Sequence, residues 1–513
     1  MKVLVMPANQ SIEVEKETTL LEAIRQMGIF IESPCGGNHT CGKCKVLVTK
    51  GNDRRVTKEE EMALTQEEIM RGMRLACSFT VNEEVTAFIR KESKNRTALT
   101  KQIKQEPAQL QEQLGVAIDI GTTTVEFHIL SLKTKRLVGK QRFYNPQIAY
   151  GADVIARITY CLNHKDGQKM LHDCLLSKLN EEIEHCCNTL GVSVKQISRV
   201  VMVCNTTMSY IAQGTDVKEL AKAPFVISNK GDCHYTGQDF GLTVCPEASI
   251  YMAPIIGGHV GSDAFACLVA TKMDQLKGNY LLVDVGTNGE ILLSVNGGLY
   301  ACSTAAGPAF EGAGLSCGMR ADSGAITKAV VKDGQIVVNV VDHLRAAGIS
   351  GSGIIDVLAA MLKLQVMDDT GYIHKDICSE KGYLVAGNAY VTRNDVRQIQ
   401  LAKGAIYAGI DCLLKQAGIR KQDLDGIYLA GAFGSNIDVR NAMILGLLPD
   451  VDIRKVDNVG NAAITGAKEL LLNSSVREHY LEKRNEIQHI ELADTPMFRE
   501  CFINSLNFRS ILF

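Results

Sequence analysis

Two stretches of the chain combine the same apolar run with the same polar turn. The first, 116–124, reads VAIDIGTTT, and the second, 281–290, reads LLVDVGTNGE. A continuous apolar run predicts a buried strand, and the glycine and hydroxyl residues after it are typical of a turn that binds phosphate. The turn residues are Asp119, Gly121, Thr122, Thr123 and Thr124 in the first stretch and, in register with the first four, Asp284, Gly286, Thr287 and Asn288 in the second. An ordinary hairpin would account for one such stretch, but the repetition favours two related lobes with one phosphate turn each.

The first 92 residues carry the pattern of a small β-rich domain. Residues 2–6 and 11–15 alternate between apolar and polar positions, as paired strands do, and residues 19–28 place apolar side chains at helical spacing. Gly28 would end that helix. A strand-like KVLVT at 45–49 follows a glycine-rich loop. We therefore expect a separate domain over residues 1–92.

After residue 92 the chain first becomes polar and then alternates between strand and helix patterns. Residues 93–113 are polar, rich in Lys and Gln and free of aromatic side chains, which predicts a linker. From residue 114 strands alternate with amphipathic helices, the order of an α/β protein. We expect a first lobe over 114–250, a second lobe over 251–475, and a tail over 476–513 that holds one strand and one helix.

The composition narrows the class of protein and its partners. At 513 residues the chain is too long for one core, and its 46% apolar and 22% charged fractions are those of a soluble globular protein. The formal charge is −2 and no dense Lys/Arg tract occurs, so we expect neither nucleic acid nor a membrane as a partner. No run of about 18 apolar residues exists and the apolar start is too short for a signal peptide, which predicts a cytoplasmic protein.

Four of the 17 cysteines have the spacing of metal-cluster ligands. Cys35, Cys41 and Cys44 share a tight glycine-rich loop and Cys77 lies far downstream, so four thiolates can surround a two-iron cluster. A zinc site is the alternative, but zinc ribbons bring their ligands as two short pairs rather than as a triplet and a single residue. His39 lies inside the loop, yet Cys77 already completes four ligands and Rieske-type sites use two histidines.

Two further glycine-rich turns are candidate nucleotide contacts. One opens an apolar helix and offers N–H groups to an anion through Gly351, Ser352 and Gly353. The other follows a strand over 425–430, and its backbone can lie against a flat ring at Gly431, Ala432, Phe433 and Gly434. Residues 253–263 also contain glycines and an acidic residue, but a turn that feeds a packed helix is the better interpretation of Gly257, Gly258, Gly261 and Asp263.

These motifs resemble two known protein groups. The paired D-x-G-T turns, followed by the glycine turn at 430–434, resemble the acetate and sugar kinase, Hsp70 and actin superfamily and occur in its order. That resemblance implies a two-lobed α/β ATPase. Threonine and glycine N–H groups would bind the β- and γ-phosphates of ATP, while Asp119 and Asp284 would hold Mg²⁺ or its waters and orient the attacking water. The cysteine loop, whose first gap is five residues long, resembles the adrenodoxin-like [2Fe-2S] ferredoxins, which implies a β-grasp domain.

Taken together, the two groups make the chain similar to the reductive activators of corrinoid proteins, which fuse a [2Fe-2S] domain to an actin-like ATPase. The resemblance implies that the cluster returns one electron to an inactive Co(II) corrinoid and restores Co(I) for methyl transfer. The implied partners are a corrinoid-binding methyl-transfer protein and an upstream electron donor. ATP is needed because the step is uphill, and each ~59 mV of adverse potential costs about 1.4 kcal/mol for one electron. Only Cys501 lies in the tail, so the C-terminal iron–sulfur cysteines of related methylamine-methyltransferase activators are absent.

Three other functions fit parts of the pattern. The chain would also suit an activator of another low-potential metalloenzyme, as the 2-hydroxyacyl-CoA dehydratase activators of the same superfamily are. A small-molecule kinase with a regulatory cluster is the second alternative. The third is a docking protein gated by a nucleotide that it hardly hydrolyses. The nature of the reduced cluster, phosphoryl transfer to an acceptor, and single-turnover hydrolysis separate these functions.

Overall fold

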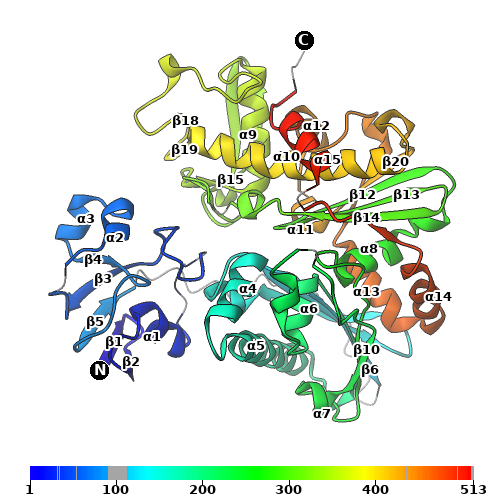
Figure 1. Ribbon diagram of the computed structural model, residues 1–513, viewed down its shortest axis with the longest axis horizontal. Coiled ribbons are helices and arrows are strands. Elements are labelled where there is room, and N and C mark those ends of the chain that lie inside the picture. The colour runs from blue at the N-terminus through cyan, green and yellow to red at the C-terminus, as the bar shows by residue number, and fades with distance from the viewer. Residues whose placement is uncertain are drawn as a thin grey trace.

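The computed structural model describes residues 1–29, 31, 33, 35–53, 55–89, 112–223, 225–312, 314–434, 436–493 and 495–509. An N-terminal domain lies beside two lobes, and the two lobes lie one against the other (Figure 1). The segment predicted as a linker, 93–113, falls outside the described residues except for its last two positions.

The N-terminal domain is a five-stranded mixed sheet covered by helix α1 (Leu20–Gln26). Its sheet order is β2 (Gln10–Glu13), β1 (Lys2–Met6), β5 (Val85–Phe88), β3 (Lys45–Lys50) and β4 (Met73–Leu75). Thr19 is the N-cap of α1, and its hydroxyl accepts a hydrogen bond from the N–H of Glu22 at 3.2 Å. The predicted strand pair, helix and β-grasp arrangement are confirmed.

Two short helices of this domain, α2 (Lys58–Ala63) and α3 (Gln66–Met70), were not predicted. Each begins with a reciprocal capping box, Thr57 with Glu60 and Thr65 with Glu68. The T-x-x-E pattern that encodes a capping box is present in the sequence. Their lengths of six and five residues leave too little apolar periodicity for a pattern to detect.

Both lobes are built on six-stranded sheets that share the topology of five strands and differ in the sixth, which is β10 beside β11 in the first sheet and β22 beside β14 in the second. In each sheet three antiparallel strands are extended by two parallel strands on the side of the first strand. The first sheet has the order β10 (Cys233–Thr236), β11 (Ser249–Met252), β9 (Ile197–Cys204), β6 (Leu114–Ile120), β7 (Thr124–Ser131) and β8 (Leu137–Tyr144). The second has the order β21 (Val456–Gly460), β20 (Gly426–Ala430), β12 (Asn279–Val285), β13 (Gly289–Val295), β14 (Gly298–Thr304) and β22 (Gln488–His489). The predicted repeat is therefore confirmed at the level of topology.

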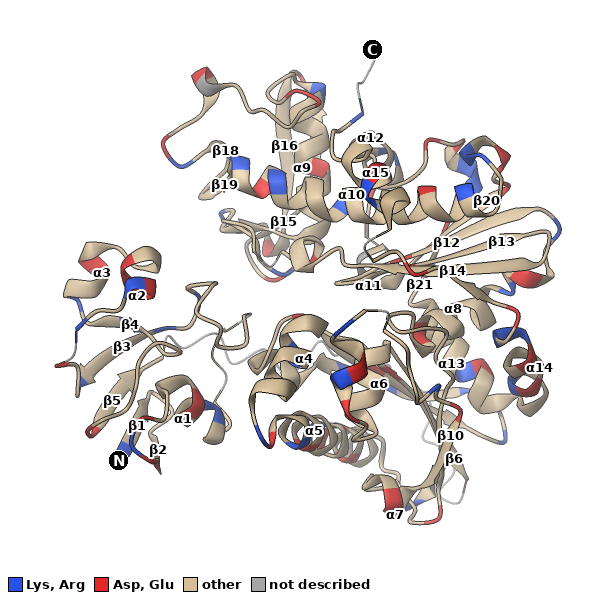
Figure 2. Ribbon diagram, viewed as in Figure 1, with Lys and Arg blue, Asp and Glu red and all other residues tan. Residues whose placement is uncertain are grey.

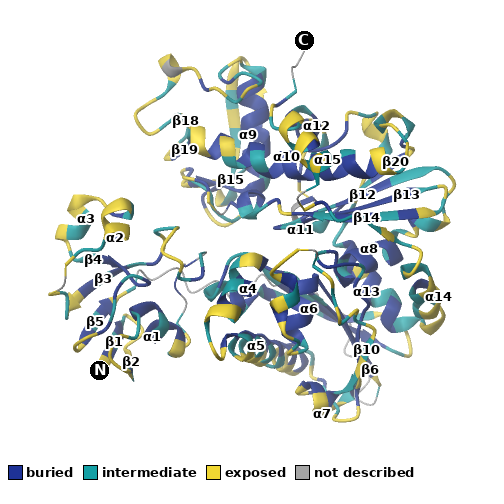
Figure 3. Ribbon diagram, viewed as in Figure 1, coloured by how far each residue is buried: buried dark blue, intermediate teal, exposed yellow. Residues whose placement is uncertain are grey.

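Helices α8 (Ser262–Thr271) and α13 (Ala462–Leu472) pack between the two sheets. They share one apolar core with residues of both lobes, among them Val203 of β9 and Leu292 of β13. The outer face of the first sheet is covered by α5 (Gly167–Leu190), and that of the second by α9 (Gly351–Lys363) and α10 (Arg393–Gln416). In Figure 3, α8 and α13 are mostly buried, whereas the ribbons of α5 and α10 carry buried, intermediate and exposed residues.

The strand and helix expected in the tail are present and belong to the second lobe. Strand β22 pairs in parallel with β14, and α15 (Pro496–Asn504) packs on α10. Lys403 of α10 is almost fully buried, and its ammonium group donates to the backbone oxygens of Ser505, at 2.5 Å, and Asn507. The tail is thereby held on the lobe, together with α14 (Ser474–Arg484), which precedes β22.

Charged side chains of both signs are scattered over the N-terminal domain and both lobes (Figure 2). Within the described residues, no helix is long and apolar enough to cross a membrane.

Candidate functional site

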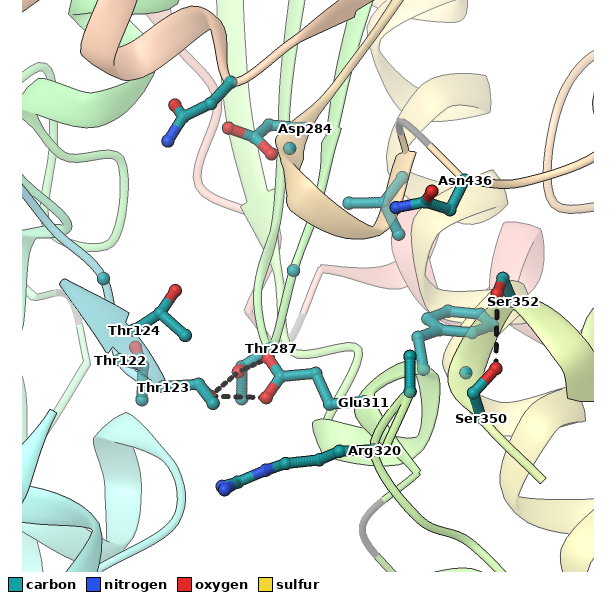
Figure 4. A pocket seen from close by; sticks show the side chains of 18 of the residues that line it. Thr122, Thr123, Thr124, Asp284, Thr287, Glu311, Arg320, Ser350, Ser352 and Asn436 are labelled. Atoms are coloured by element: carbon teal, nitrogen blue, oxygen red, sulfur yellow. Dashed lines mark hydrogen bonds between the residues drawn. The ribbon is translucent and has the colours of Figure 1, made fainter. Parts of the chain in front are cut away.

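A cavity of about 730 Å³ lies between the lobes, and both predicted phosphate turns line it. The β6–β7 turn brings Thr122, Thr123 and Thr124 from the first lobe, and the β12–β13 turn brings Thr287 and Asn288 from the second. Figure 4 shows threonines of the two turns pointing towards one another across the cavity. Hydroxyl donors from both lobes therefore meet at one place, as phosphate binding requires.

The glycine N–H groups of the two turns do not face the cavity as free donors. Gly121 donates its N–H to the backbone oxygen of Thr124 at 2.9 Å, and Gly286 donates its N–H to that of Asn288 at 3.0 Å. A Cβ at Gly121 would come within 2.7 Å of the Thr124 oxygen, so this close turn needs glycine. Gly121 and Gly286 themselves line the cavity, and in this structure their N–H groups close the turns.

The Glu311 carboxylate joins the two turns. It accepts a hydrogen bond from the Thr123 hydroxyl on the first lobe and one of 2.5 Å from the Thr287 hydroxyl on the second. Glu311 ends the 3₁₀ turn η5 (Pro308–Glu311), and Figure 4 shows its side chain reaching between the two threonines. No sequence motif marked this residue, because a single glutamate after an A-G-P-A-F segment has no periodicity or spacing of its own.

A group of carboxylates lies deeper in the cavity, at the ends of β6 and β12. Burial raises the pKa of Asp119 to about 7 despite a hydrogen bond from Asn461, and Asp263 adds to the shift. Burial and the charge of Asp119 raise the pKa of Asp284 to about 6. The pKa of Asp263 is raised to about 7 by burial and by Asp284, and that of Glu290 is raised for the same kinds of reason. These acids repel one another when ionised, so the cavity favours a cation among them.

Two of these residues were not predicted as site residues. Asp263 stands in the first turn of α8 and lines the cavity, although the glycine-rich stretch before it was interpreted as a turn into a packed helix. That interpretation holds for Gly261, whose added Cβ would meet the backbone of Asn205 at 2.4 Å. Asn461 caps α13 and donates from Nδ2 to Asp119 at 3.0 Å and to Glu126 at 3.2 Å. The start of α13 therefore positions the first acidic residue.

The glycine–serine turn is only partly in the cavity. Gly351 and Ser352 line it with Ser350, but Gly353 does not. The N–H of Gly353 is donated to the Ser350 hydroxyl at 3.2 Å, and a Cβ there would lie 2.1 Å from the oxygen of Ile326. The expectation that Gly353 binds an anion is therefore corrected, since its N–H caps α9 and its missing side chain allows α9 to pack on β15 (Ala325–Lys332).

The turn predicted to hold adenosine follows β20 as the short helix α11 (Gly431–Gly434). Gly431 lines the cavity with φ +89°, and a Cβ on it would lie 2.4 Å from Oδ1 of Asp284. Gly434 accepts a hydrogen bond from Asn458 Nδ2 at 2.6 Å through its backbone oxygen, and Asn436 lines the cavity beyond it. The side chains of Ala432 and Phe433 lie outside the described part of the structure.

Basic side chains that the sequence pattern did not single out also line the cavity. They are Arg142 on β8, Arg320, and Lys328 on β15. The Arg320 guanidinium lies 3.7 Å from the ring centroid of Tyr144, which holds it across the first lobe. Single arginines and lysines on strands carry no signal in a sequence, but in the fold they bring positive charge to the phosphate turns.

The four cysteines of the N-terminal domain gather at one end of its sheet as two pairs. Cys41 and Cys35 have their sulfurs 3.3 Å apart, and Cys77 donates its N–H to the Cys44 sulfur at 3.5 Å. A hydrogen bond from Cys41 lowers the pKa of the Cys35 thiol to about 4, and one from Cys44 lowers the pKa of the Cys77 thiol to about 6. In the described residues no three His, Cys, Asp or Glu side chains converge as around a single metal ion. A donor set of two thiol pairs fits a two-iron cluster, in which each iron takes two thiolates.

Comparison with known proteins covers all three parts. Residues 3–82 match the 2Fe-2S iron-sulfur cluster binding domain, residues 114–276 the RACo middle region, and residues 278–511 the C-terminal domain of RACo, the ASKHA domain. The corrinoid activation enzyme RamQ of Eubacterium limosum is 34% identical over 417 residues, which cover 77% of this chain and 70% of RamQ. The Co(II) methylated amine-specific corrinoid protein reductase of Methanosarcina barkeri is 27% identical over 77% of each chain.

A solved structure supports the same relationship over the full length. The structure of a reductive activator for corrinoid, iron-sulfur protein matches with a TM-score of 0.71 and 27% identity, and covers 99% of this chain and 98% of that one. The N-terminal domain is accordingly a member of the 2Fe-2S domain family. The first lobe corresponds to the RACo middle region and the second lobe to the C-terminal ASKHA domain of RACo. The chain belongs to the family of corrinoid activation enzymes.

Proposed function

We propose that this protein uses ATP to drive one electron from a [2Fe-2S] cluster onto the cobalt of a corrinoid protein, converting Co(II) to the Co(I) that accepts a methyl group. The observation that carries the proposal is the cavity between the lobes, where phosphate turns of both lobes meet at Glu311. The names of the relatives RamQ and the Co(II) corrinoid protein reductase support the reaction class. An upstream donor would reload the cluster, and the 17 free cysteines suit a reducing cytoplasm.

ATP would bind with its phosphates between the two turns. The hydroxyls of Thr122, Thr123, Thr124 and Thr287 and the backbone of Asn288 supply donors, while Gly351, Ser352, Gly431 and Gly434 would lie along the nucleoside side. Asp119 and Asp284 would hold Mg²⁺ or its waters, because their carboxylates share the crowded acidic end of the cavity. When bound, Mg²⁺ supplies charge neutralisation to the phosphates.

Glu311 has the chemistry of the general base for hydrolysis. The threonine hydroxyls that it now contacts are donors that a terminal phosphate would also use. A phosphate at these hydroxyls would leave the carboxylate beside the phosphorus. The water oxygen attacks the γ-phosphorus, its proton passes to the Glu311 carboxylate, and the bond to the ADP oxygen breaks. Release of inorganic phosphate would then let Glu311 return to the two hydroxyls, and no phosphorylated acceptor is formed.

The N-terminal domain would hold the cluster through Cys35, Cys41, Cys44 and Cys77. The Cys35 sulfur accepts hydrogen bonds from the backbone of Gly37, Thr40 and Cys41, which stabilise negative charge on it. When loaded, the cluster supplies the electron for the partner's cobalt. Cys44 and Cys77 are buried, whereas Cys35 and Cys41 are half-exposed, so the electron would leave through the loop side of the domain.

The test is reduction of a partner with and without nucleotide. The reduced protein is mixed with a Co(II) corrinoid protein, and Co(I) absorbance is followed with and without MgATP. We expect Co(I) to accumulate only with MgATP. In Asp284→Asn, MgATP should no longer cause Co(I) to accumulate. Asp333→Asn, on the exposed turn between β15 and β16 (Gln335–Val340), is the matched control and should behave as wild type. Equal Co(I) without ATP, or phosphorylation of an added small acceptor, would contradict the proposal.

Gly431→Ala should weaken nucleotide binding through Asp284. Its Cβ would lie 2.4 Å from Oδ1 of that carboxylate, on a residue with φ +89°. Backbone strain of roughly 1–3 kcal/mol and a displaced carboxylate predict a loss of about tenfold or more in affinity for MgATP, measured by calorimetry. Gly418→Ala is the control, since Gly418 also has positive φ but nothing lies within 4 Å of its Cβ position. Equal affinities in the two variants would show that the contact with Asp284 is not needed.

A further inference from the structure

The segment 145–151, here called the bridge segment, is bonded to the phosphate turn of the first lobe. Asn145 donates from Nδ2 to the backbone oxygen of Gly121 at 2.9 Å and from its backbone N–H to that of Thr123 at 3.0 Å. Arg157 donates from Nη2 to the oxygen between them, that of Thr122. Three successive carbonyl groups of the turn are therefore held from behind.

Arg157 ties the same turn to the far end of the bridge segment. It stands on α4 (Val154–Asn163), is fully buried, and donates from Nε to the oxygen of Gly151 and from Nη1 to Oε1 of Gln147, both at 3.0 Å. Burying a guanidinium costs free energy unless its N–H donors are paired, and these three acceptors pair the donors of Arg157. Asn145 and Gln147 are buried as well. The bridge segment is thus held by buried polar contacts at both of its ends.

The other side of the bridge segment receives the cluster domain. Ser33 donates its hydroxyl to the oxygen of Ala149 at 3.0 Å, 116 positions along the chain. Gly36, with φ +69°, lies so close that a Cβ would be 2.6 Å from the oxygen of Tyr150. Gly36 follows the candidate cluster ligand Cys35 directly. The loop that carries the cysteines, residues 35–44, therefore rests on the bridge segment.

A buried arginine completes this contact. The Arg25 guanidinium lies 5.2 Å from the ring centroid of Tyr150 and 5.5 Å from that of Tyr160, and only 7% of the residue is exposed. It also donates to the Ser33 hydroxyl at 3.2 Å. A cation–π contact is strongest when the cation and the ring are shielded from water, as they are for Arg25 with its two tyrosine rings. Arg25 is thereby held between the first lobe and the cluster loop.

We propose that the bridge segment, with Arg157, is a positioning element through which nucleotide bound at the phosphate turn moves the cluster loop. The proposal rests on the proposed function, which places ATP at the turn and the cluster at the cysteines. Each peptide group is planar, so the N–H of Thr122 and the oxygen of Gly121 belong to one rigid unit, as do the N–H of Thr123 and the oxygen of Thr122. The turn cannot aim these N–H groups at a phosphate without re-aiming the oxygens that Asn145 and Arg157 hold.

The test measures a response of the cluster loop to nucleotide in the full-length, cluster-loaded protein. Hydrogen–deuterium exchange of residues 35–44 and the midpoint potential of the cluster are measured with and without a non-hydrolysable ATP analogue and Mg²⁺. In wild type we expect the analogue to change loop exchange by roughly fivefold or more and to shift the potential. Tyr150→Ala should remove both responses, whereas its affinity for the analogue stays within about twofold. Tyr150→Phe keeps the ring and should respond as wild type.

Two further variants separate the ends of the element. Arg25→Gln should remove the response as Tyr150→Ala does, and Arg71→Gln, on an exposed arginine of the same domain, is its control. Asn145→Ala acts at the turn and should reduce both nucleotide affinity and the loop response. If wild type binds the analogue but its loop and potential do not respond, or if Tyr150→Ala still responds, the inference is overturned and the proposed function stands. If wild type binds no nucleotide, both are overturned.

Discussion

Replacing Glu311 with glutamine is expected to lower ATP hydrolysis roughly 10²-fold or more without loss of nucleotide binding. The amide has nearly the shape of the carboxylate and can still accept a hydrogen bond from Thr123 or Thr287, but it cannot accept the proton of the attacking water. Removal of a negative charge beside the phosphates should leave affinity for ATP unchanged or raised. Single-turnover hydrolysis and calorimetry on the same preparation measure the two quantities.

Glu380→Gln is the matched control, because Glu380 is exposed on the same lobe and away from the cavity. Its hydrolysis should equal that of wild type. If Glu311→Gln hydrolyses ATP at the wild-type rate, Glu311 serves only to join the two turns. If it fails to bind nucleotide, its contribution is to binding and not to the chemical step.

Cys44→Ser is expected to abolish the cluster and with it all electron transfer to the corrinoid protein. A serine hydroxyl is a poor substitute for a thiolate towards iron, and the Cys44 side chain is buried, so no other thiol of the described chain can take its place without a rearrangement of the loop. The visible absorbance and iron content should fall to background. Binding of MgATP should persist, because the nucleotide cavity is built entirely from the two lobes.

Cys245→Ser, in the first lobe, provides the control for cysteine removal and should keep its iron. A variant at Cys44 that retains a full complement of iron would exclude this residue as a ligand. Loss of nucleotide binding together with the cluster would mean that the domains do not fold as separate units.

The motifs visible in the sequence are those in which several functional residues are neighbours in the chain. The phosphate turns and the cysteine loop fall in this class, and the repetition of the turn predicts the two-lobed fold that the sheets show. Their local hydrogen bonds were harder to predict. The N–H groups of Gly121, Gly286 and Gly353 are used inside the protein, and only the folded backbone reveals that.

Residues that act alone escaped prediction for a physical reason. Glu311, Asn461 and Arg157 each reach the site from a different element, and their neighbours in the chain do not take part in the contact. A lone glutamate or arginine in a sequence is most often a solvated surface residue. Only the packing of the lobes shows that Arg157 is fully buried and that Glu311 lies between two hydroxyls.

Helix α13 has a consequence for the way the protein is made. It comes from the C-terminal part of the chain, yet it packs on β6 and β9 of the first lobe and buries Ala117 and Val201 with them. During synthesis the first lobe emerges early, but this face of its sheet is covered only in part, by α8, until α13 leaves the ribosome, and exposed apolar sheet favours aggregation. The first lobe therefore cannot mature as a unit of its own, and a fragment that ends before residue 462 is expected to depend on chaperones or to precipitate.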